Sequence, residues 1–245
     1  MPDLHLSATI EEASQTNARF VADLAQQCVA AQGRFTIALS GGSTPRVLYQ
    51  LLASRPLADG MAWDRWQVFW SDERCVPPDH LDSNYRMARE ELLDHVAIPD
   101  TNVHRMRGED DPREAARAYE AIVLKVLQSP VPSFDLILLG IGDDGHTASL
   151  FPGSQALQEQ DRLVADNWAP QVGAHRLTFT LPLLNAAKAI AFLDTDESKA
   201  EVLRRVLEPK SGEEDLPASL VRPGQGTVHW FLTDKAAKLL TKNYV

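Results

Sequence analysis

Short apolar runs alternate with longer amphipathic segments along this chain, and no other feature restricts its possible folds as strongly. The runs typical of buried strands are residues 35–39, 66–70, 134–139, 177–180, 189–193 and 228–232. Apolar residues at helical spacing separate several of them, at 15–32, 112–128 and 197–207. Strands that alternate with helices form mostly parallel sheets with helices on both faces. We therefore predict an α/β fold with a mostly parallel sheet covered by helices on both faces.

The composition along the sequence does not indicate a boundary between domains. The most loop-like stretch, 208–226, is rich in Pro, Gly and acidic residues, and predicts a long surface loop with a short helix at 217–220. Since no linker divides the chain, we predict a single domain over residues 1–245.

Net charge limits the partners of this protein. With 24 Lys and Arg against 34 Asp and Glu, the formal charge is −10 at pH 7, which argues against nucleic acids and membrane surfaces. Any anionic ligand must therefore meet a locally positive site. Cys28 and Cys75 are too few and too far apart for a disulfide framework or a zinc site. The sequence shows neither a signal peptide nor a membrane span, so we expect a cytoplasmic protein.

The loop SGGSTP at 40–45 directly follows the predicted strand 35–39. Its Pro45 is favoured at a first helical position, so we predict a helix over 45–53 whose N-terminus faces the strand end. Free amides and the helix dipole at such a point favour an anion. The backbone and hydroxyl groups that we expect to hold a phosphate belong to Gly41, Gly42, Ser43 and Thr44. The loop lacks the lysine of a nucleotide-triphosphate loop, and a plain strand–turn–helix is the alternative.

Two further strand ends carry polar loops. Asp72, Glu73 and Arg74 follow strand 66–70, where a surface ion pair is the alternative interpretation. The loop 139–147 reads LGIGDDGHT, with glycines in the G-x-G-x-x-G spacing of dinucleotide sites. Its two aspartates would repel a pyrophosphate, so we favour a general base, His146, beside an orienting carboxylate, Asp144.

Nucleophilic serine chemistry is not indicated. The chain has no G-x-S-x-G motif, and we interpret Ser149 as a residue at the start of a helix. His, Cys and Asp residues show no spacing that would predict a metal cluster.

Taken in order, these loops resemble those of the 6-phosphogluconolactonase family, whose relatives are the glucosamine-6-phosphate isomerase/deaminases. The matching segments are SGGSTP at 40–45, WSDERCVP at 70–77, DSNYRMARE at 82–90, LLGIGDDGHTASLFPGS at 138–154, RLTFTLPLLNAA at 176–187 and DESKAEVL at 196–203. The resemblance spans residues 35–232, nearly the whole chain. It implies a Rossmann-like fold of the isomerase/deaminase type.

The resemblance also implies a reaction, the hydrolysis of 6-phospho-D-glucono-1,5-lactone to 6-phospho-D-gluconate in the oxidative pentose phosphate pathway. We expect His146 to act as the base for the attacking water, with Asp144 orienting its imidazole. Arg74 either stabilises the oxyanion or holds sugar hydroxyls, and Asp72 accepts a hydroxyl. Arg176 and Lys199 supply the counter-charge of the phosphate.

Lactone hydrolysis by a placed water requires no cofactor and no metal. The expected partner is a small phosphorylated lactone, without nucleic acid or membrane. We expect a monomer and leave an oligomer open.

Sequence features distinguish lactone hydrolysis from three alternative functions. The isomerase/deaminases continue after Asp-Gly-His with Ile-Ala-Phe-Asn-Glu-Pro, whereas residues 147–152 here read TASLFP and lack that glutamate. A sugar-phosphate binding protein without turnover would not need the pair of Asp144 and His146. A dehydrogenase rests only on the glycine spacing.

Overall fold

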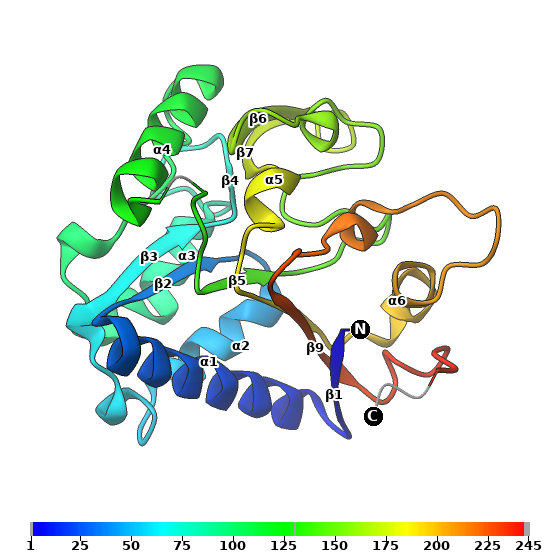
Figure 1. The fold of residues 1–245 in the computed structure, drawn as a ribbon, viewed down its shortest axis with the longest axis horizontal. Helices are drawn as coiled ribbons and strands as arrows, with labels where there is room; N and C mark the ends of the chain where they lie inside the picture. The colour runs from blue at the N-terminus through cyan, green and yellow to red at the C-terminus, as the bar shows by residue number, and fades with distance from the viewer. Residues whose placement is uncertain (1, 130, 243–245) are drawn as a thin grey trace.

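The computed structural model describes residues 2–129 and 131–242. Its main sheet consists of β1 (Asp3–Ser7), β2 (Phe35–Leu39), β3 (Trp66–Trp70), β5 (Leu136–Leu139), β8 (Ala189–Asp194) and β9 (Thr227–Thr233). These strands are parallel throughout and lie in the order β1-β9-β8-β5-β2-β3 (Figure 1). All but β1 fall on predicted runs: β2 and β3 match them fully, and the ends of β5, β8 and β9 differ by one or two residues. β1 has half-exposed residues on an edge and shows no apolar run in the sequence.

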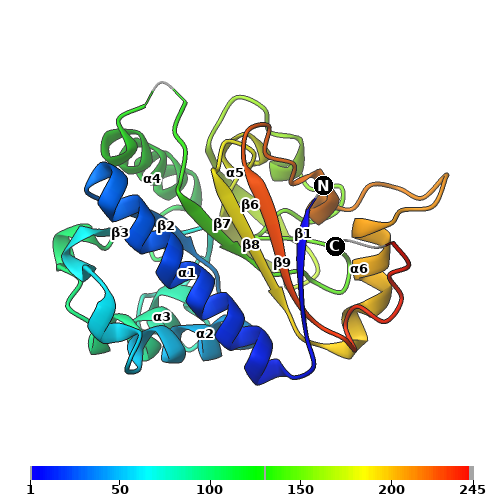
Figure 2. The same cartoon turned by 60° about the horizontal axis from the view of Figure 1, so that its bottom comes forward.

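Helices cover both faces of this sheet, as predicted. They are α1 (Ile10–Gln32), α2 (Ser43–Ala53), α3 (Asn84–Glu91), α4 (Pro112–Leu127), α5 (Leu181–Leu184) and α6 (Ala200–Leu207). Ile37 and Leu39 of β2 pack with α1, α2 and α3 in one core, whereas Ala38 faces the core that contains α4, α5 and α6. Figure 2 shows α1 lying across one face of the sheet, with α4 behind it and α6 to the right of β1. Alternate residues of the buried strands thus serve two separate cores.

A second, antiparallel sheet comes from β4 (Asp72–Arg74), β6 (Val164–Ala169) and β7 (Ala174–Phe179), in the order β4-β7-β6. The predicted strand 177–180 therefore belongs to this small sheet rather than to the parallel one. The chain passes between the sheets at Ser71. Its N–H donates to the Leu39 carbonyl at 2.8 Å, and its carbonyl accepts from the Phe179 N–H at 2.8 Å.

Helix ends follow local chemistry. Thr9 and Asp111 accept hydrogen bonds from the first turns of α1 and α4, and Gly33 ends α1 in the left-handed conformation. Single 3₁₀ turns occur at Ala58–Gly60, Trp63–Arg65, Leu93–His95, Asp100–Asn102, Ala156–Gln158, Glu197–Lys199 and Pro217–Leu220. The predicted helix 197–207 thus begins as a 3₁₀ turn. In the described ranges, no helix combines the length and hydropathy that a membrane span requires.

The segment 208–226 does more than cover the surface. The predicted short helix is present as the turn Pro217–Leu220, but Leu216 and Ala218 are buried. The Ala218 N–H donates to the Gly145 carbonyl at 3.0 Å. This segment therefore supports the glycine-rich loop 140–145 from below.

Candidate active site

A cavity of about 210 Å³ opens where the three predicted loops meet at the carboxyl ends of β2, β3 and β5. Ligands of open α/β sheets bind at such edges. Its walls include Gly41, Gly42, Asp72, Arg74, Asn84 and His146. The structure thus brings together residues that are more than 100 positions apart, and five of these six were predicted as site residues.

His146 and Asp144 form the pair that the sequence predicted. The Asp144 Oδ1 atom lies 2.6 Å from His146 Nδ1 and also accepts the His146 backbone N–H at 3.1 Å. Burial alone would raise the pKa of Asp144, but these two hydrogen bonds outweigh it and lower the pKa. An ionised carboxylate at Nδ1 requires a proton there, which leaves Nε2 as the basic nitrogen of a neutral imidazole.

The glycines around this pair are explained by contacts with the histidine and its support. A Cβ atom on Gly142 would lie 2.0 Å from His146 Nδ1, and the Gly142 N–H donates to the His146 carbonyl at 2.9 Å. Gly145 has a φ of +78°, and a Cβ atom there would lie 2.7 Å from Leu216 Cδ1. On the other side, the Phe151 ring lies 4.5 Å from the imidazole, centroid to centroid. The glycine spacing therefore serves the placement of His146.

The 40–45 loop differs in detail from the prediction. Helix α2 begins at Ser43, with Gly42 as its N-cap at a φ of +110° and no side-chain hydrogen bond. Ser43 and Thr44 are therefore not caps, and Pro45 is the third helical residue rather than the first. The reason is that Gly42 makes the turn itself, in a conformation that Ser and Thr rarely adopt. Gly41 and Gly42 line the cavity, and Ser43 and Thr44 form the first turn behind them.

Tyr49 hydrogen-bonds to Ser40, the residue after β2, and the sequence did not predict this role. Its hydroxyl donates to the Ser40 carbonyl at 2.7 Å and accepts the Ser40 N–H at 3.0 Å. The side chain is fully buried, and this burial raises the pKa of its hydroxyl far above the ordinary value. Its spacing within an apolar helix face gave no sign of this role.

The charged residues Glu73 and Arg74 make different contacts. Glu73 is buried and holds α3, because its carboxylate accepts the N–H groups of Asn84 at 2.7 Å and Tyr85 at 2.8 Å. Arg74 Nη1 donates to the Asp82 carbonyl at 2.9 Å. Arg176 stands directly opposite Arg74 in the ladder between β4 and β7. Burial, and then the charge of Arg74, lower the pKa of Arg176. Of these two arginines, Arg74 lines the cavity, whereas Arg176, its neighbour across the ladder, does not.

Ser149 lies in a tight turn and not at the start of a helix, so that interpretation was wrong. Its Oγ donates to Asp72 Oδ2 at 2.8 Å, and its N–H donates to Thr178 Oγ1 at 3.1 Å. Asn167 Nδ2 donates to the Ser149 carbonyl at 2.8 Å. These bonds hold the preceding Ala148 at a φ of +47°, which is unusual for a residue with a side chain.

Lys199 lies apart from the cavity wall. Its Nζ pairs with the carboxylate of Asp143, which is the residue before Asp144 in the glycine-rich loop. Asp194, at the end of β8, is buried, and burial raises its pKa to about 6, against the opposing effects of the Asp196 N–H and of the Lys199 charge. The structure therefore places Lys199 against the glycine-rich loop and away from the cavity wall, while Arg176 lies beside Arg74.

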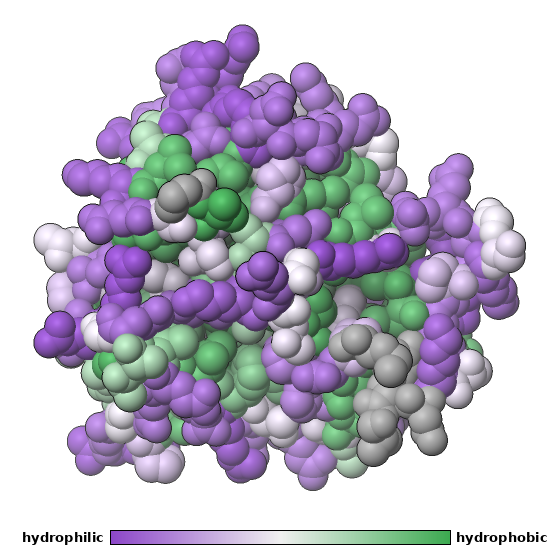
Figure 3. All heavy atoms as spheres, viewed as in Figure 1, coloured by the Kyte–Doolittle hydropathy of each residue, from purple (hydrophilic) through white to green (hydrophobic). Residues whose placement is uncertain are grey.

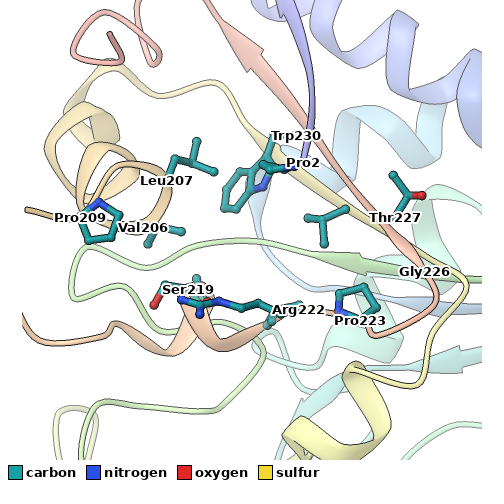
Figure 4. A pocket seen from close by; sticks show the side chains of 13 residues that line it. Pro2, Val206, Leu207, Pro209, Ser219, Arg222, Pro223, Gly226, Thr227 and Trp230 are labelled. Atoms are coloured by element: carbon teal, nitrogen blue, oxygen red, sulfur yellow. The ribbon is translucent and has the colours of Figure 1, made fainter. Parts of the chain in front are cut away.

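A larger cavity, of about 600 Å³, lies elsewhere, between β9, α6 and the segment 217–223. Trp230, Val206 and Leu207 line it, with Arg222 at its edge (Figure 4). Figure 3 shows apolar residues in a hollow between α6 and β9, with hydrophilic residues around it. None of the predicted site residues lines this cavity. Among the described residues, no group of three or more His, Cys, Asp and Glu side chains is arranged to hold a metal ion.

Comparisons with known proteins agree with this geometry. Residues 8–230 match the family model described as glucosamine-6-phosphate isomerases/6-phosphogluconolactonase. The chain is 44% identical to a 6-phosphogluconolactonase of Synechocystis sp., with 87% of this chain and 88% of that protein covered. It is 42% identical to a human 6-phosphogluconolactonase, with 94% and 91% covered.

The structure also superimposes on a solved 6-phosphogluconolactonase from Trypanosoma cruzi with a TM-score of 0.89. That match has 30% sequence identity and covers 99% of this chain and 98% of the other. The chain therefore belongs to the family of glucosamine-6-phosphate isomerases and 6-phosphogluconolactonases.

Proposed function

We propose that this protein hydrolyses 6-phospho-D-glucono-1,5-lactone to 6-phospho-D-gluconate, as a step of the pentose phosphate pathway. The observation that carries the proposal is the imidazole of His146 on the cavity wall, with its Nδ1 atom 2.6 Å from Asp144 Oδ1. The similarity to 6-phosphogluconolactonases over most of the chain supports the same reaction.

The geometry supports a mechanism of water activation. His146 Nε2 takes a proton from a water molecule whose oxygen attacks the lactone carbonyl carbon, and a tetrahedral oxyanion forms. Asp144 keeps the other ring nitrogen protonated and stabilises the imidazolium that results. When the oxyanion collapses, the bond between the carbonyl carbon and the ring oxygen breaks. The imidazolium then returns its proton to that oxygen, which becomes a hydroxyl group of the product.

Positive groups around the cavity suit the charges of this substrate. Arg74, on the cavity wall, either stabilises the oxyanion or holds sugar hydroxyls. Asp72 still has free lone pairs beside its bond to Ser149 and can accept a sugar hydroxyl. We assign the phosphate to Gly41, Gly42, Ser43 and Thr44, with Arg176 and Lys199 as its counter-charges. Lys199 reaches a phosphate only by leaving Asp143.

The proposal includes a single-domain monomer that works in the cytoplasm. Cys28 and Cys75 are both free thiols, which is typical of a reducing compartment. The substrate needs neither a nucleic acid nor a membrane partner.

Decay of the phospholactone, generated in situ and followed with and without the protein, tests the reaction. We expect decay well above the spontaneous rate. The same preparation is offered glucosamine 6-phosphate, from which we expect no ammonia, because residues 147–152 lack the glutamate of the deaminase sequence. Ammonia release above background, together with lactone decay at only the spontaneous rate, would assign the protein to the isomerase/deaminase branch.

A further inference from the structure

One oxygen on the cavity wall has no protein donor. Asn84 lines the cavity and is only 3% exposed. Its side-chain nitrogen is fully engaged with Asp72, whereas its Oδ1 atom accepts no hydrogen bond from any described residue. Since Oδ1 is also not among the oxygens sealed away from solvent, it is an open acceptor that faces the cavity.

The orientation of this amide follows from its neighbour. Nδ2 lies 2.9 Å from the Asp72 carbonyl oxygen and 3.4 Å from Asp72 Oδ1. Both of these atoms are acceptors, so the NH₂ group must face them and the oxygen must point the other way. A flipped amide would place three acceptors together and lose both contacts. The direction of Oδ1 is therefore fixed by the hydrogen bonds of Asp72.

The backbone beneath Asn84 is equally constrained. It is the first residue of α3, and its N–H donates to Glu73 Oε1 at 2.7 Å. The next N–H, of Tyr85, donates to Glu73 Oε2 at 2.8 Å, and the Ser83 hydroxyl donates to the same oxygen at 3.1 Å. Because a buried carboxylate holds three groups at the start of α3, Asn84 is preorganised before any ligand arrives.

The side-chain amide of Asn84 fits beside Gly41 because glycine has no Cβ atom. A Cβ atom on Gly41 would lie 1.9 Å from Asn84 Oδ1 and 2.3 Å from its Cγ atom. The side chain of Asn84 thus occupies the space that any other residue at position 41 would fill. Gly41 was assigned to the phosphate, but this contact gives it a second task, which is to bring Oδ1 up to the cavity.

We propose that Asn84 recognises the sugar ring, with Oδ1 accepting a hydrogen bond from one of its hydroxyl groups. This assignment rests on the proposed function, because it takes the cavity as the site of the lactone. The positive groups and free amides nearby are donors suited to anionic oxygens, whereas a hydroxyl that donates needs an acceptor. A substrate without that hydroxyl would leave Oδ1 buried and unpaired, which is unfavourable.

The test compares the parent phospholactone with its 2-deoxy, 3-deoxy and 4-deoxy analogues. For wild type, kcat/KM should be about 3- to 10-fold lower on the one analogue that lacks the hydroxyl bound by Asn84, because the hydrogen bond to Oδ1 is then missing. Asn84→Ala should lose a similar factor on the parent lactone. On that same analogue the variant should show no further loss, because the partner of the missing hydroxyl is already gone.

A matched control separates recognition from a shift of α3. Ser83→Ala removes a hydroxyl that caps the same helix and binds Glu73, but that does not line the cavity. It should keep the wild-type ranking of the four lactones. Two results would contradict the proposal that Asn84 binds a hydroxyl group. One is that Ser83→Ala changes the ranking of kcat/KM over the four lactones as Asn84→Ala does, and the other is that Asn84→Ala keeps the wild-type ranking.

Binding of the product, 6-phosphogluconate, measured by calorimetry on wild type and both variants, makes the result independent of turnover. Binding without hydrolysis by wild type would overturn the proposed function alone. The assignment of Asn84 would then stand if Asn84→Ala, but not Ser83→Ala, weakened binding by about 3- to 10-fold. Hydrolysis with unchanged substrate ranking in Asn84→Ala would overturn the assignment alone. A protein that neither binds nor hydrolyses would overturn both.

Discussion

Asp144 and His146 are two residues apart, yet one carboxylate oxygen, Asp144 Oδ1, lies within 3.1 Å of both the His146 backbone nitrogen and its Nδ1 atom. A single acceptor therefore fixes both the backbone and the ring of the histidine. This arrangement needs no residue from elsewhere in the chain, and it leaves Nε2 free for the substrate side.

Replacing the base should abolish most of the catalysis. His146→Ala should lower kcat by about 10²–10⁴-fold, the usual contribution of a general acid–base. Product binding should change little, because the proposed phosphate contacts remain. Stopped-flow decay of the phospholactone, corrected for spontaneous hydrolysis, measures the effect. As a control, His95→Ala removes an imidazole that does not line the cavity and whose Nε2 atom lies 2.8 Å from the Glu90 carbonyl oxygen. More than a third of wild-type activity in His146→Ala would refute the assignment.

Asp144 should act through His146, so its loss should be graded. Asp144→Asn keeps an oxygen that can still accept from Nδ1 but has no charge, whereas Asp144→Ala has neither. We expect kcat to fall by about 10-fold or more in the first and by up to about 10³-fold in the second, with KM nearly constant. Steady-state kinetics on both variants give the split. Equal losses in both variants, accompanied by a raised KM, would instead indicate a disturbed loop.

The phosphate assignment predicts a change in selectivity. Hydrogen bonds to charged groups are worth roughly 1.5–3 kcal/mol, so Arg176→Ala or Lys199→Ala should lower kcat/KM for the phospholactone by about 10–100-fold. Unphosphorylated gluconolactone, which offers these cations nothing, should be hydrolysed at the unchanged low rate. Lys238→Ala, which removes an exposed lysine paired with Glu197, is the control.

The outcomes of that experiment separate three roles for each cation. Equal loss on both lactones would place the cation at the carbonyl. Unchanged selectivity in both variants would remove Arg176 and Lys199 from the phosphate site. Lys199 is ion-paired with Asp143, whereas Arg176 forms no ion pair within the described part of the chain. We therefore expect the larger loss for Arg176.

Asp194 should make the protein less stable as the pH rises. Burial raises its folded-state pKa to about 6 from 3.8, so the unfolded chain releases this proton at lower pH than the folded one. Its contribution is fully present below pH 4 and is lost as the pH rises towards and through 6. By about pH 8 the buried charge should cost roughly 1–3 kcal/mol of unfolding free energy.

Urea unfolding of Asp194→Asn at pH 4.5 and pH 8 measures this cost. The variant cannot ionise and keeps an oxygen for the Asp196 N–H, which lies 3.1 Å from Asp194 Oδ1. It should exceed wild type in stability at pH 8 and lose most of that advantage at pH 4.5. Asp59→Asn, at an exposed position, should show no such difference. Equal stability of Asp194→Asn and wild type at pH 8 would contradict a raised pKa.

The parallel sheet was predictable because its central strands are buried on both faces. Their residues are almost all apolar, as in the fully buried β2 and β8, where Thr36 and Asp194 are the only polar residues. The small antiparallel sheet was not predictable in the same way. β4 has only three residues, all charged, and β6 mixes polar and apolar positions. β6 and β7 pack against α4, and the local sequence does not reveal this long-range contact.

The site was predictable where one loop carries its own geometry. Asp144 and His146 interact at a separation of two residues, and the sequence context predicted them as a pair. The roles of Asn84 and Ser149 were not predicted, because they depend on Asp72, which is 12 and 77 positions away. The Gly41 contact with Asn84 is equally long-range. The predicted phosphate loop already accounts for a glycine at position 41, so nothing in the sequence indicated its contact with Asn84.

The junction at Ser71 divides the proposed catalytic groups between two sheets. His146 follows β5 of the parallel sheet, whereas Arg74 belongs to the antiparallel sheet, and Ser71 hydrogen-bonds to both through Leu39 and Phe179. Val164 and Phe179 of the antiparallel sheet share one buried core with Ala38 and Ile137 of the parallel sheet. Because side chains in such a core are closely packed, the spacing between His146 and Arg74 depends on residues that lie outside the cavity.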